Sequence, residues 1–215
     1  GMTTADALFA VGDGSGASSH KFTSGSHAEG RIAGKAAIKY IVEKGAEPNV
    51  DSAQVEKLKT EILAPFDLFE AHKGETTDPE INTNYIMPRQ FLHRLQKLMD
   101  EYAGGVTSAF KTSKSLLERG MELMDMLKED SVKQAAGDVH DLMRVWENIQ
   151  RMWIAESHIR TMLFREETRW PGYYFRADTP KMDEENWKCF ANCRWDPSTG
   201  EWEMIKRDVW NMPGV

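Results

Sequence analysis

Three stretches of helical periodicity between residues 88 and 162 place the strongest constraint on the fold of this chain. In each stretch apolar residues recur every three or four positions, as they do in a helix with one buried face. Pro88 suits the first turn of the first helix, Gly104-Gly105 would end it, and Asp138 would begin the third. The apolar positions are Phe91, Leu92, Leu95, Leu98, Met99 and Tyr102, then Leu116, Leu117, Met121, Met124 and Leu127, then Leu142, Val145, Trp146, Ile149, Met152, Trp153, Ile159 and Met162. We expect an antiparallel bundle of three or four helices.

A further helix is expected before the bundle. Asp51 is a typical N-cap residue, and an apolar face follows it as far as Pro65, which we expect to end the helix. The polar segment 72–84 is predicted to be irregular. Within the bundle, the methionine-rich stripe is interpreted as core packing, and it comprises Met121, Met124 and Met126.

The end of the chain alternates in the manner of β-strands. Residues 187–195 alternate between two faces, Asp196-Pro197-Ser198-Thr199-Gly200 is a strong turn signal, and alternation resumes over 201–209. This pattern predicts a β-hairpin. Cys189 and Cys193 would face the same side of its first strand, but a metal site needs more thiolates or histidines than these two. We therefore expect two ordinary cysteines and no metal site in this chain.

The first 50 residues differ from the rest. Leu8-Phe9-Ala10-Val11 is predicted to be a short buried strand, followed by a Gly/Ser-rich loop and a helix from about Ser24 to Glu43. Ser24 or Ser26 would cap that helix, and Gly45 signals its end. A lone strand leaves its backbone groups unpaired. Its partners would come either from the distant C-terminal hairpin or from sequence outside this chain.

Composition excludes several classes of protein. The formal net charge of −7 argues against non-specific nucleic-acid binding. No stretch approaches the roughly 20 apolar residues of a membrane span, and the start of the chain lacks the basic segment of a signal peptide. Two cysteines in 215 residues do not make a disulfide framework, which favours a reducing compartment. We expect a cytoplasmic protein.

The Gly/Ser-rich loop admits several interpretations. The first is a Walker-type phosphate loop, but the required Gly-Lys-Ser/Thr ending is missing. The second is a dinucleotide-binding motif, since Gly12, Gly14 and Ala17 have its spacing. However, the chain is predicted to continue as a loop where that motif requires a helix to begin. A third reading makes Asp13 an acceptor for sugar or ribitol hydroxyls. The amides around Ser24-Gly25-Ser26 would then favour negative charge on a ligand, because they begin a helix. A plain loop is the remaining alternative.

Several runs of residues carry a more specific signal. The first set is F-A-V-G-D-G-S-G at 9–16, S-G-S at 24–26 and E-G-R-I-A-G at 29–34. These runs resemble the second FAD-binding motif of the fumarate reductase/succinate dehydrogenase flavoprotein superfamily. Within it, the alpha subunits of dissimilatory adenylylsulfate reductases are similar at H-K-F-T-S-G-S (20–26), R-E-E-T-R-W-P-G-Y-Y (165–174) and M-D-E-E-N-W-K-C-F (182–190).

The resemblance implies an FAD-dependent oxidoreductase of sulfur metabolism. Such an enzyme interconverts adenosine 5'-phosphosulfate with sulfite and AMP through a flavin–sulfite adduct, and an iron–sulfur beta subunit supplies the electrons. Gly12 and Asp13 would bind FAD, with Asp13 on the ribitol. The amides of Ser24, Gly25 and Ser26 would stabilise the flavin N1/O2 edge, and His20 would act as the catalytic group at the isoalloxazine face. Iron–sulfur clusters are expected only on the partner subunit.

The same resemblance divides the chain into three parts. Residues 1–50 would end an FAD-binding α/β domain, 51–169 would form a helical domain, and 170–215 an extended tail with the hairpin. The fold class is thus mainly α. The family's N-terminal G-x-G-x-x-G segment and capping domain are absent from this sequence. We therefore expect a piece of a longer subunit, with an incomplete FAD site and no activity on its own.

Two other functions compete with this one. Fumarate reductases, succinate dehydrogenases and aspartate oxidases usually carry His-x-x-x-Arg after the flavin loop to clamp a dicarboxylate, but Ser24 stands four residues after His20. A non-catalytic helical scaffold would leave the residues from Gly12 to Ser26 unexplained. Charged residues at 165–176 are expected to form an ion-pair network that locks the tail onto the FAD domain or a partner. The C-terminal aromatic residues could serve packing or an interface.

Overall fold

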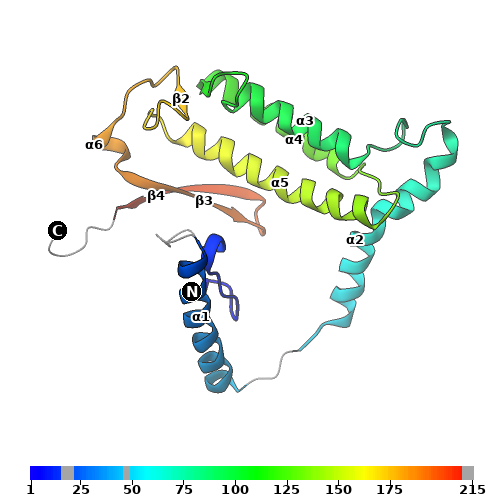
Figure 1. The fold of residues 1–215 in the computed structure, drawn as a ribbon, viewed down its shortest axis with the longest axis horizontal. Coiled ribbons are helices and arrows are strands. Elements are labelled where there is room, and N and C mark those ends of the chain that lie inside the picture. The colour runs from blue at the N-terminus through cyan, green and yellow to red at the C-terminus, as the bar shows by residue number, and fades with distance from the viewer. Residues whose placement is uncertain (16–21, 46–48, 210–215) are drawn as a thin grey trace. The chain divides into compact units, whose positions relative to one another are not determined.

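The structure is a computed structural model that describes residues 1–15, 22–45 and 49–209. The chain divides into two compact units, Gly1–Val55 and Glu56–Val215. Helices dominate both units, and the strands are confined to two small two-stranded sheets (Figure 1). The prediction of a mainly α chain with a C-terminal hairpin is therefore confirmed. Among the described residues, no helix is long and apolar enough to cross a membrane.

The first ten residues fold back on themselves. The Thr3 amide donates to the Leu8 carbonyl at 2.8 Å, and the Ala10 amide donates to the Gly1 carbonyl at 2.8 Å. Met2 and Phe9 form a single antiparallel bridge. The predicted buried strand at residues 8–11 is therefore wrong, since Leu8 is 56% exposed. The backbone groups of this run pair with residues 1–3, a partner that neither sequence-based alternative considered.

Helix α1, Thr23–Lys44, makes up most of the first unit. Its N-cap is Phe22, which makes no side-chain capping bond, so the prediction that Ser24 or Ser26 caps the helix is wrong. The predicted end is confirmed, because Gly45 adopts the left-handed conformation with φ of 60°. Asp6 ties the N-terminal segment to this helix through the Tyr40 hydroxyl at 2.6 Å and the Lys44 ammonium at 3.0 Å.

Helix α2, Ser52–His72, continues through Pro65. The prediction that Pro65 ends it is therefore wrong. A proline inside a helix loosens the hydrogen bonds of the preceding turn, and here that turn has another partner. The Trp146 indole N–H donates to the Ile62 carbonyl at 3.1 Å, and the Pro65 carbonyl accepts the Ala136 amide at 3.0 Å. A short turn, η2 (Lys73–Glu75), and irregular chain follow, as predicted.

Three helices form the predicted bundle. They are α3 (Pro88–Tyr102), α4 (Lys114–Ser131) and α5 (Val139–Phe164), and Pro88 stands in the first turn of α3. The Asp138 carboxylate caps α5 by accepting the Asp141 amide at 2.8 Å. Gly104, with φ of 77°, allows the chain to turn sharply after α3.

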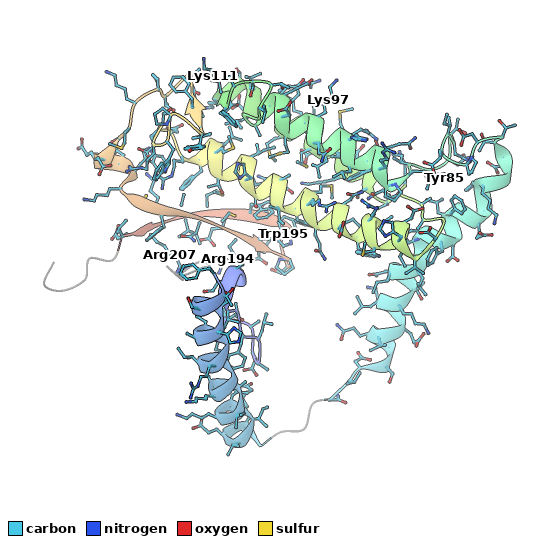
Figure 2. All side chains as sticks on the ribbon, in the orientation of Figure 1. Tyr85, Lys97, Lys111, Arg194, Trp195 and Arg207 are labelled. Atoms are coloured by element: carbon cyan, nitrogen blue, oxygen red, sulfur yellow. The ribbon has the colours of Figure 1, made fainter. Side chains whose placement is uncertain are left out.

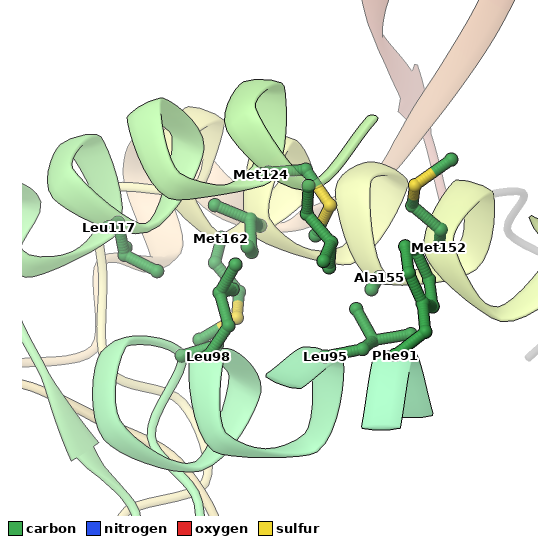
Figure 3. Packing of buried hydrophobic residues seen from close by; sticks show 11 residues of the cluster. Phe91, Leu95, Leu98, Leu117, Met124, Met152, Ala155 and Met162 are labelled. Atoms are coloured by element: carbon green, nitrogen blue, oxygen red, sulfur yellow. The ribbon is translucent and has the colours of Figure 1, made fainter. Parts of the chain in front are cut away.

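The core of the second unit lies between these three helices (Figure 3). Phe91, Leu117 and Met124 are fully buried there, and Gly120 lets α3 and α4 approach closely. A Cβ atom at Gly120 would lie 3.1 Å from Cβ of Tyr102. The methionine stripe is only partly core, because Met126 is 58% exposed. The buried cluster comprises Phe91, Leu95, Leu98, Ala103, Leu117, Met124, Leu127, Met152, Ala155, Ile159 and Met162.

The C-terminal hairpin packs along α5 (Figure 1). Its strands are β3 (Cys189–Asp196) and β4 (Glu201–Asp208), and Trp195 pairs with Trp202 across them. Trp195, labelled in Figure 2, lies edge-on to Trp153 of α5 with ring centroids 5.1 Å apart. Trp195 and Trp202 of the hairpin therefore pack against the rest of the chain, whereas Trp170 and Tyr173 are exposed. Both cysteines of β3 are free thiols.

A second small sheet fastens the chain that follows α5. Strand β1 (Lys111–Thr112) pairs in parallel with β2 (Phe175–Arg176), and the single-turn helix α6 (Glu184–Trp187) leads into the hairpin. The Phe175 amide donates to the Phe110 carbonyl at 2.9 Å. The segment after α5 is therefore held against the loop that joins α3 to α4.

A network of charges surrounds this segment. The buried Glu167 carboxylate bonds to Arg165 and to Arg169, the latter at 2.7 Å, and it accepts the Asp183 amide at 2.9 Å. Burial alone would raise the pKa of Glu167, but the hydrogen bonds from Arg169, the Asp183 amide and Arg165 together lower it. The ion-pair network itself is confirmed, but these partners all belong to the second unit. The described contacts therefore do not include the predicted lock onto the FAD domain, and a lock onto a partner stays a prediction.

Arg176 forms the second half of the network. It is fully buried, its guanidinium donates to the Met162 carbonyl at the end of α5, and its Nε lies 2.9 Å from the Asp178 carboxylate. Arg165 reaches further along the chain, because it donates to the carbonyls of Trp187 and Cys189. The same network therefore links the end of α5 to the first residue of the hairpin.

Replacing Phe91 by alanine should test the packing of the bundle. We expect a loss of about 3–5 kcal/mol of unfolding free energy, because a fully buried aromatic side chain leaves a cavity. Phe190→Ala is the matched control, since Phe190 is 59% exposed and should change stability by less than about 1 kcal/mol. Urea unfolding followed by circular dichroism measures both. Equal losses in the two variants would contradict the assigned core.

Replacing Glu167 by glutamine should remove a pH-dependent part of the stability. A carboxylate whose pKa is lowered by folding contributes fully above its unfolded pKa of about 4.3, and the contribution disappears as the pH falls through the folded pKa. The difference in unfolding free energy between wild type and Glu167→Gln should therefore be large at pH 7 and shrink below about pH 4. Glu166→Gln, at an exposed position, should show no such trend. A pH-independent difference would contradict this account.

Candidate functional site

The predicted cofactor-binding residues lie in the first unit, at a tight turn and at the beginning of α1. The turn η1 spans Gly12–Gly14, and Gly12 is buried with φ of 58°. A Cβ atom at Gly12 would lie 3.0 Å from Oγ of Ser26. Gly12 is therefore required for two reasons, its left-handed backbone and its contact with α1. The structure brings Gly12 and Ser26 together, as the prediction of a shared site requires.

The backbone amides of this turn differ in whether they have a hydrogen-bond acceptor. The Gly12 amide donates to Oε2 of Glu29 at 2.6 Å, the Gly14 amide to the Val11 carbonyl at 3.2 Å, and the Ser15 amide to the Gly12 carbonyl at 3.0 Å. The Asp13 amide has no hydrogen-bond partner among the described residues. It is thus the amide of this turn that remains available to a ligand.

The first turn of α1 offers further donors. The Ser26 amide makes the first helical bond, to the Phe22 carbonyl at 3.0 Å. The amides of Thr23, Ser24 and Gly25 precede that bond, so they lie at the positive end of the helix dipole. The Ser24 and Gly25 amides therefore lie where helix donors face a negatively charged ligand, and their role at a cofactor edge stays a prediction. The Ser26 amide is already occupied, and its side chain faces Gly12 instead.

The Asp13 side chain completes the site. It is exposed, and it makes no hydrogen bond or ion pair with any residue that the structure describes. A carboxylate in this state can accept two or more hydrogen bonds from ligand hydroxyls. The close glycine, the open carboxylate and the helix amides together fit the ribitol and the electron-rich edge of a flavin. We find that the residues present suit this cofactor.

Other predicted residues, and the cavities of the second unit, are not part of this site. His20 lies outside the described residues, as do Ala17 and the rest of 16–21. Among the described residues, no group of three or more His, Cys, Asp or Glu side chains could hold a metal ion. Two cavities of about 710 and 680 Å³ lie along α3 and α5 in the second unit, and no predicted site residue lines them.

Sequence reasoning assigned no contact to Glu29. A signal for it does exist, because Glu29 lies three residues after Ser26 and thus on the same face of the helix. That face meets Gly12 in the folded chain. The contact could not be read from the sequence alone, since it joins residues 17 positions apart.

Comparison with known proteins decides the family. The model described as fumarate reductase flavoprotein C-term matches residues 92–213, more than half of the chain. The chain belongs to this flavoprotein family. A curated relative is the adenylylsulfate reductase alpha subunit of Megalodesulfovibrio gigas, with 47% identity over 98% of this chain and 32% of that protein. The chain thus spans about a third of the length of this relative.

Solved structures of the family agree with the described fold. Adenylylsulfate reductase from Archaeoglobus fulgidus matches with a TM-score of 0.90 and 50% identity, covering 95% of this chain and 32% of that one. A structure titled as a complex of adenosine-5-phosphosulfate reductase with sulfite, as a covalent adduct, matches with the same values. Quinol fumarate reductase of E. coli matches with a TM-score of 0.67 and 19% identity over 97% of this chain and 35% of that one. The last comparison shows a shared fold alone.

Replacing Gly12 by alanine should disturb the turn. The left-handed backbone costs an L-residue about 1–2 kcal/mol, and the added methyl group would press on Ser26. We expect faster amide hydrogen exchange across residues 9–15 and weaker FAD binding. Gly14→Ala is the matched control, because a Cβ atom there meets nothing within 4 Å and its φ is not positive. Equal effects of the two changes would contradict the special role of Gly12.

Proposed function

We propose that this chain is part of the FAD-containing catalytic subunit of an adenylylsulfate reductase in the cytoplasm. The enzyme would interconvert adenosine 5'-phosphosulfate with sulfite and AMP. The observation that carries the proposal is the 47% identity to an adenylylsulfate reductase alpha subunit over 98% of this chain. The structural match with a TM-score of 0.90 to the Archaeoglobus fulgidus enzyme supports it independently of the sequence motifs.

Each site residue has a part in this proposal. Asp13 accepts the hydroxyls of the FAD ribitol, and Gly12 keeps the backbone close to the cofactor. The first-turn amides of Ser24 and Gly25 stabilise negative charge on the cofactor edge, with Ser26 packed behind Gly12. When bound, FAD supplies the two-electron redox chemistry. His20 binds the substrate or handles a proton beside it, for which an imidazole is suited near neutral pH.

The three parts of the chain have different tasks in the proposed enzyme. Residues 1–50 complete the FAD-binding domain, 51–169 form a helical domain, and 170–215 form the tail with the hairpin. An iron–sulfur beta subunit carries the clusters and passes electrons. Trp170, Tyr173 and Phe190 are exposed aromatic residues of the tail that a subunit contact would bury.

The alternative is an enzyme acting on fumarate, succinate or aspartate. At 19% identity, the match to quinol fumarate reductase shows a similar fold and gives no evidence for the same substrate. The arginine of His-x-x-x-Arg is absent at its expected position, because Ser24, in the first turn of α1, stands four residues after His20. The scaffold alternative does not account for Gly12 with its left-handed backbone against Ser26. Sulfite and AMP are therefore the substrates to test.

A chimeric enzyme tests the proposal. This chain replaces the matching third of the Megalodesulfovibrio gigas alpha subunit, which is produced together with its partner. The chimera should bind FAD and transfer electrons from sulfite in the presence of AMP. Succinate oxidation without sulfite oxidation would overturn the proposed substrate, and the absence of both activities with bound FAD would favour a non-catalytic role.

The same chimera tests His20. His20→Ala should lower kcat by roughly 10²-fold or more, the range for loss of a general acid or base, while FAD remains bound. His27→Ala is the control, because His27 is an exposed residue of α1. Stopped-flow or steady-state sulfite oxidation measures both variants. Unchanged turnover in His20→Ala would remove the catalytic role from this residue.

A further inference from the structure

One polar contact of the first unit has no role in the proposed cofactor binding. Oε2 of Glu29, in the second turn of α1, accepts the amide of Gly12 at 2.6 Å. Both residues are shielded from solvent in part or in full. A carboxylate that accepts a backbone N–H makes a charge-assisted hydrogen bond, which is shorter and stronger than a neutral one.

The position of Gly12 explains why this bond matters. Its left-handed backbone removes it from any regular pairing, so its buried amide needs a partner from elsewhere. Glu29 supplies that partner from the same helix face as Ser26, whose hydroxyl fills the space where a side chain would stand at Gly12. Two side chains of α1 thus hold one residue of the turn.

We propose that Glu29 is a positioning residue for the flavin site, an inference that rests on the proposed function. By holding Gly12 against α1, it sets the adjacent Asp13 amide and carboxylate beside the first turn of that helix. Both sets of ligand-binding groups then share one rigid frame. Without Glu29 the turn can move away from the helix, and the site loses its preorganisation before any ligand arrives.

The chemistry of the contact separates a positioning role from a charge effect. Glu29 acts here as a hydrogen-bond acceptor, and a glutamine side chain can present a carbonyl oxygen in the same place. Glu29→Gln should therefore keep the turn in position, whereas Glu29→Ala should release it. Glu43→Ala is the matched control, because Glu43 lies on the same helix, is 65% exposed and makes an i,i+4 pair with exposed Lys39.

The first measurement needs no cofactor. Amide hydrogen exchange at Gly12, followed by NMR on the ¹⁵N-labelled chain, should be slow in wild type, in Glu29→Gln and in Glu43→Ala. In Glu29→Ala it should become at least tenfold faster. Exchange that is equally slow in Glu29→Ala would overturn the inference. If Glu29→Ala loses its helical circular dichroism, Glu29→Gln decides, because fast exchange in a folded Glu29→Gln would also overturn it.

The second measurement places the same variants in the chimeric alpha subunit. Titration of apo-protein with FAD, read by quenching of flavin fluorescence, should give a Kd at least tenfold higher for Glu29→Ala and within about threefold of wild type for Glu29→Gln. With FAD saturating, kcat for sulfite oxidation should stay close to wild type in Glu29→Gln. A wild-type chimera that binds no FAD would refute the proposed function, while the exchange at Gly12 still decides the role of Glu29. Unchanged FAD affinity in Glu29→Ala would overturn the inference alone.

Discussion

The buried charges that follow α5 are the constraint on which the C-terminal part of the structure depends. Glu167 and Arg176 are both fully shielded from solvent, and a buried charge is tolerated only when its hydrogen-bonding groups are satisfied. The groups that satisfy these two residues are the Met162 carbonyl at the end of α5, the Asp178 carboxylate, the Asp183 amide before α6, and Arg165 and Arg169. Because Arg165 also bonds the carbonyl of Cys189, the hairpin starts from a defined point.

That anchor explains how a two-stranded sheet can persist on the bundle. An isolated hairpin is only marginally stable in water. Here its start is held by the charge network, and its inner face packs on Trp153 through Trp195 and Trp202. The charge network and the tryptophan contacts therefore both fix the position of the hairpin on α5. In the bundle, three apolar faces enclose a continuous core. The one carboxylate buried beside that core among the described bundle residues, Glu156, is paired with Lys128 at 2.7 Å and with Arg160 at 2.8 Å.

The first unit is held together by a different kind of interaction. Its described residues, 1–15, 22–45 and 49–55, include almost no buried apolar core, as Ala33 is the one buried residue of α1. Its order comes from individual polar contacts, with Glu29 on Gly12 and with Tyr40 and Lys44 on Asp6. Such a unit suits a ligand site, because the backbone donors that a core would cover stay open at the start of the helix. The relatives, about three times as long as this chain, carry a matching segment within a larger protein.

The sequence by itself determined the helices and turns whose residues follow a local pattern. The periodicity of α3, α4 and α5, the cap at Asp138 and the turn at residues 196–200 depend on local spacing, which the sequence states directly. Contacts between distant residues were decided only by the tertiary structure. Pro65 stays inside α2, where Trp146 bonds the Ile62 carbonyl in the turn before it, and Leu8–Val11 pairs with the first residues instead of joining a sheet. Glu29 meets Gly12 for the same reason, since the two residues lie 17 positions apart and no local pattern encodes their contact.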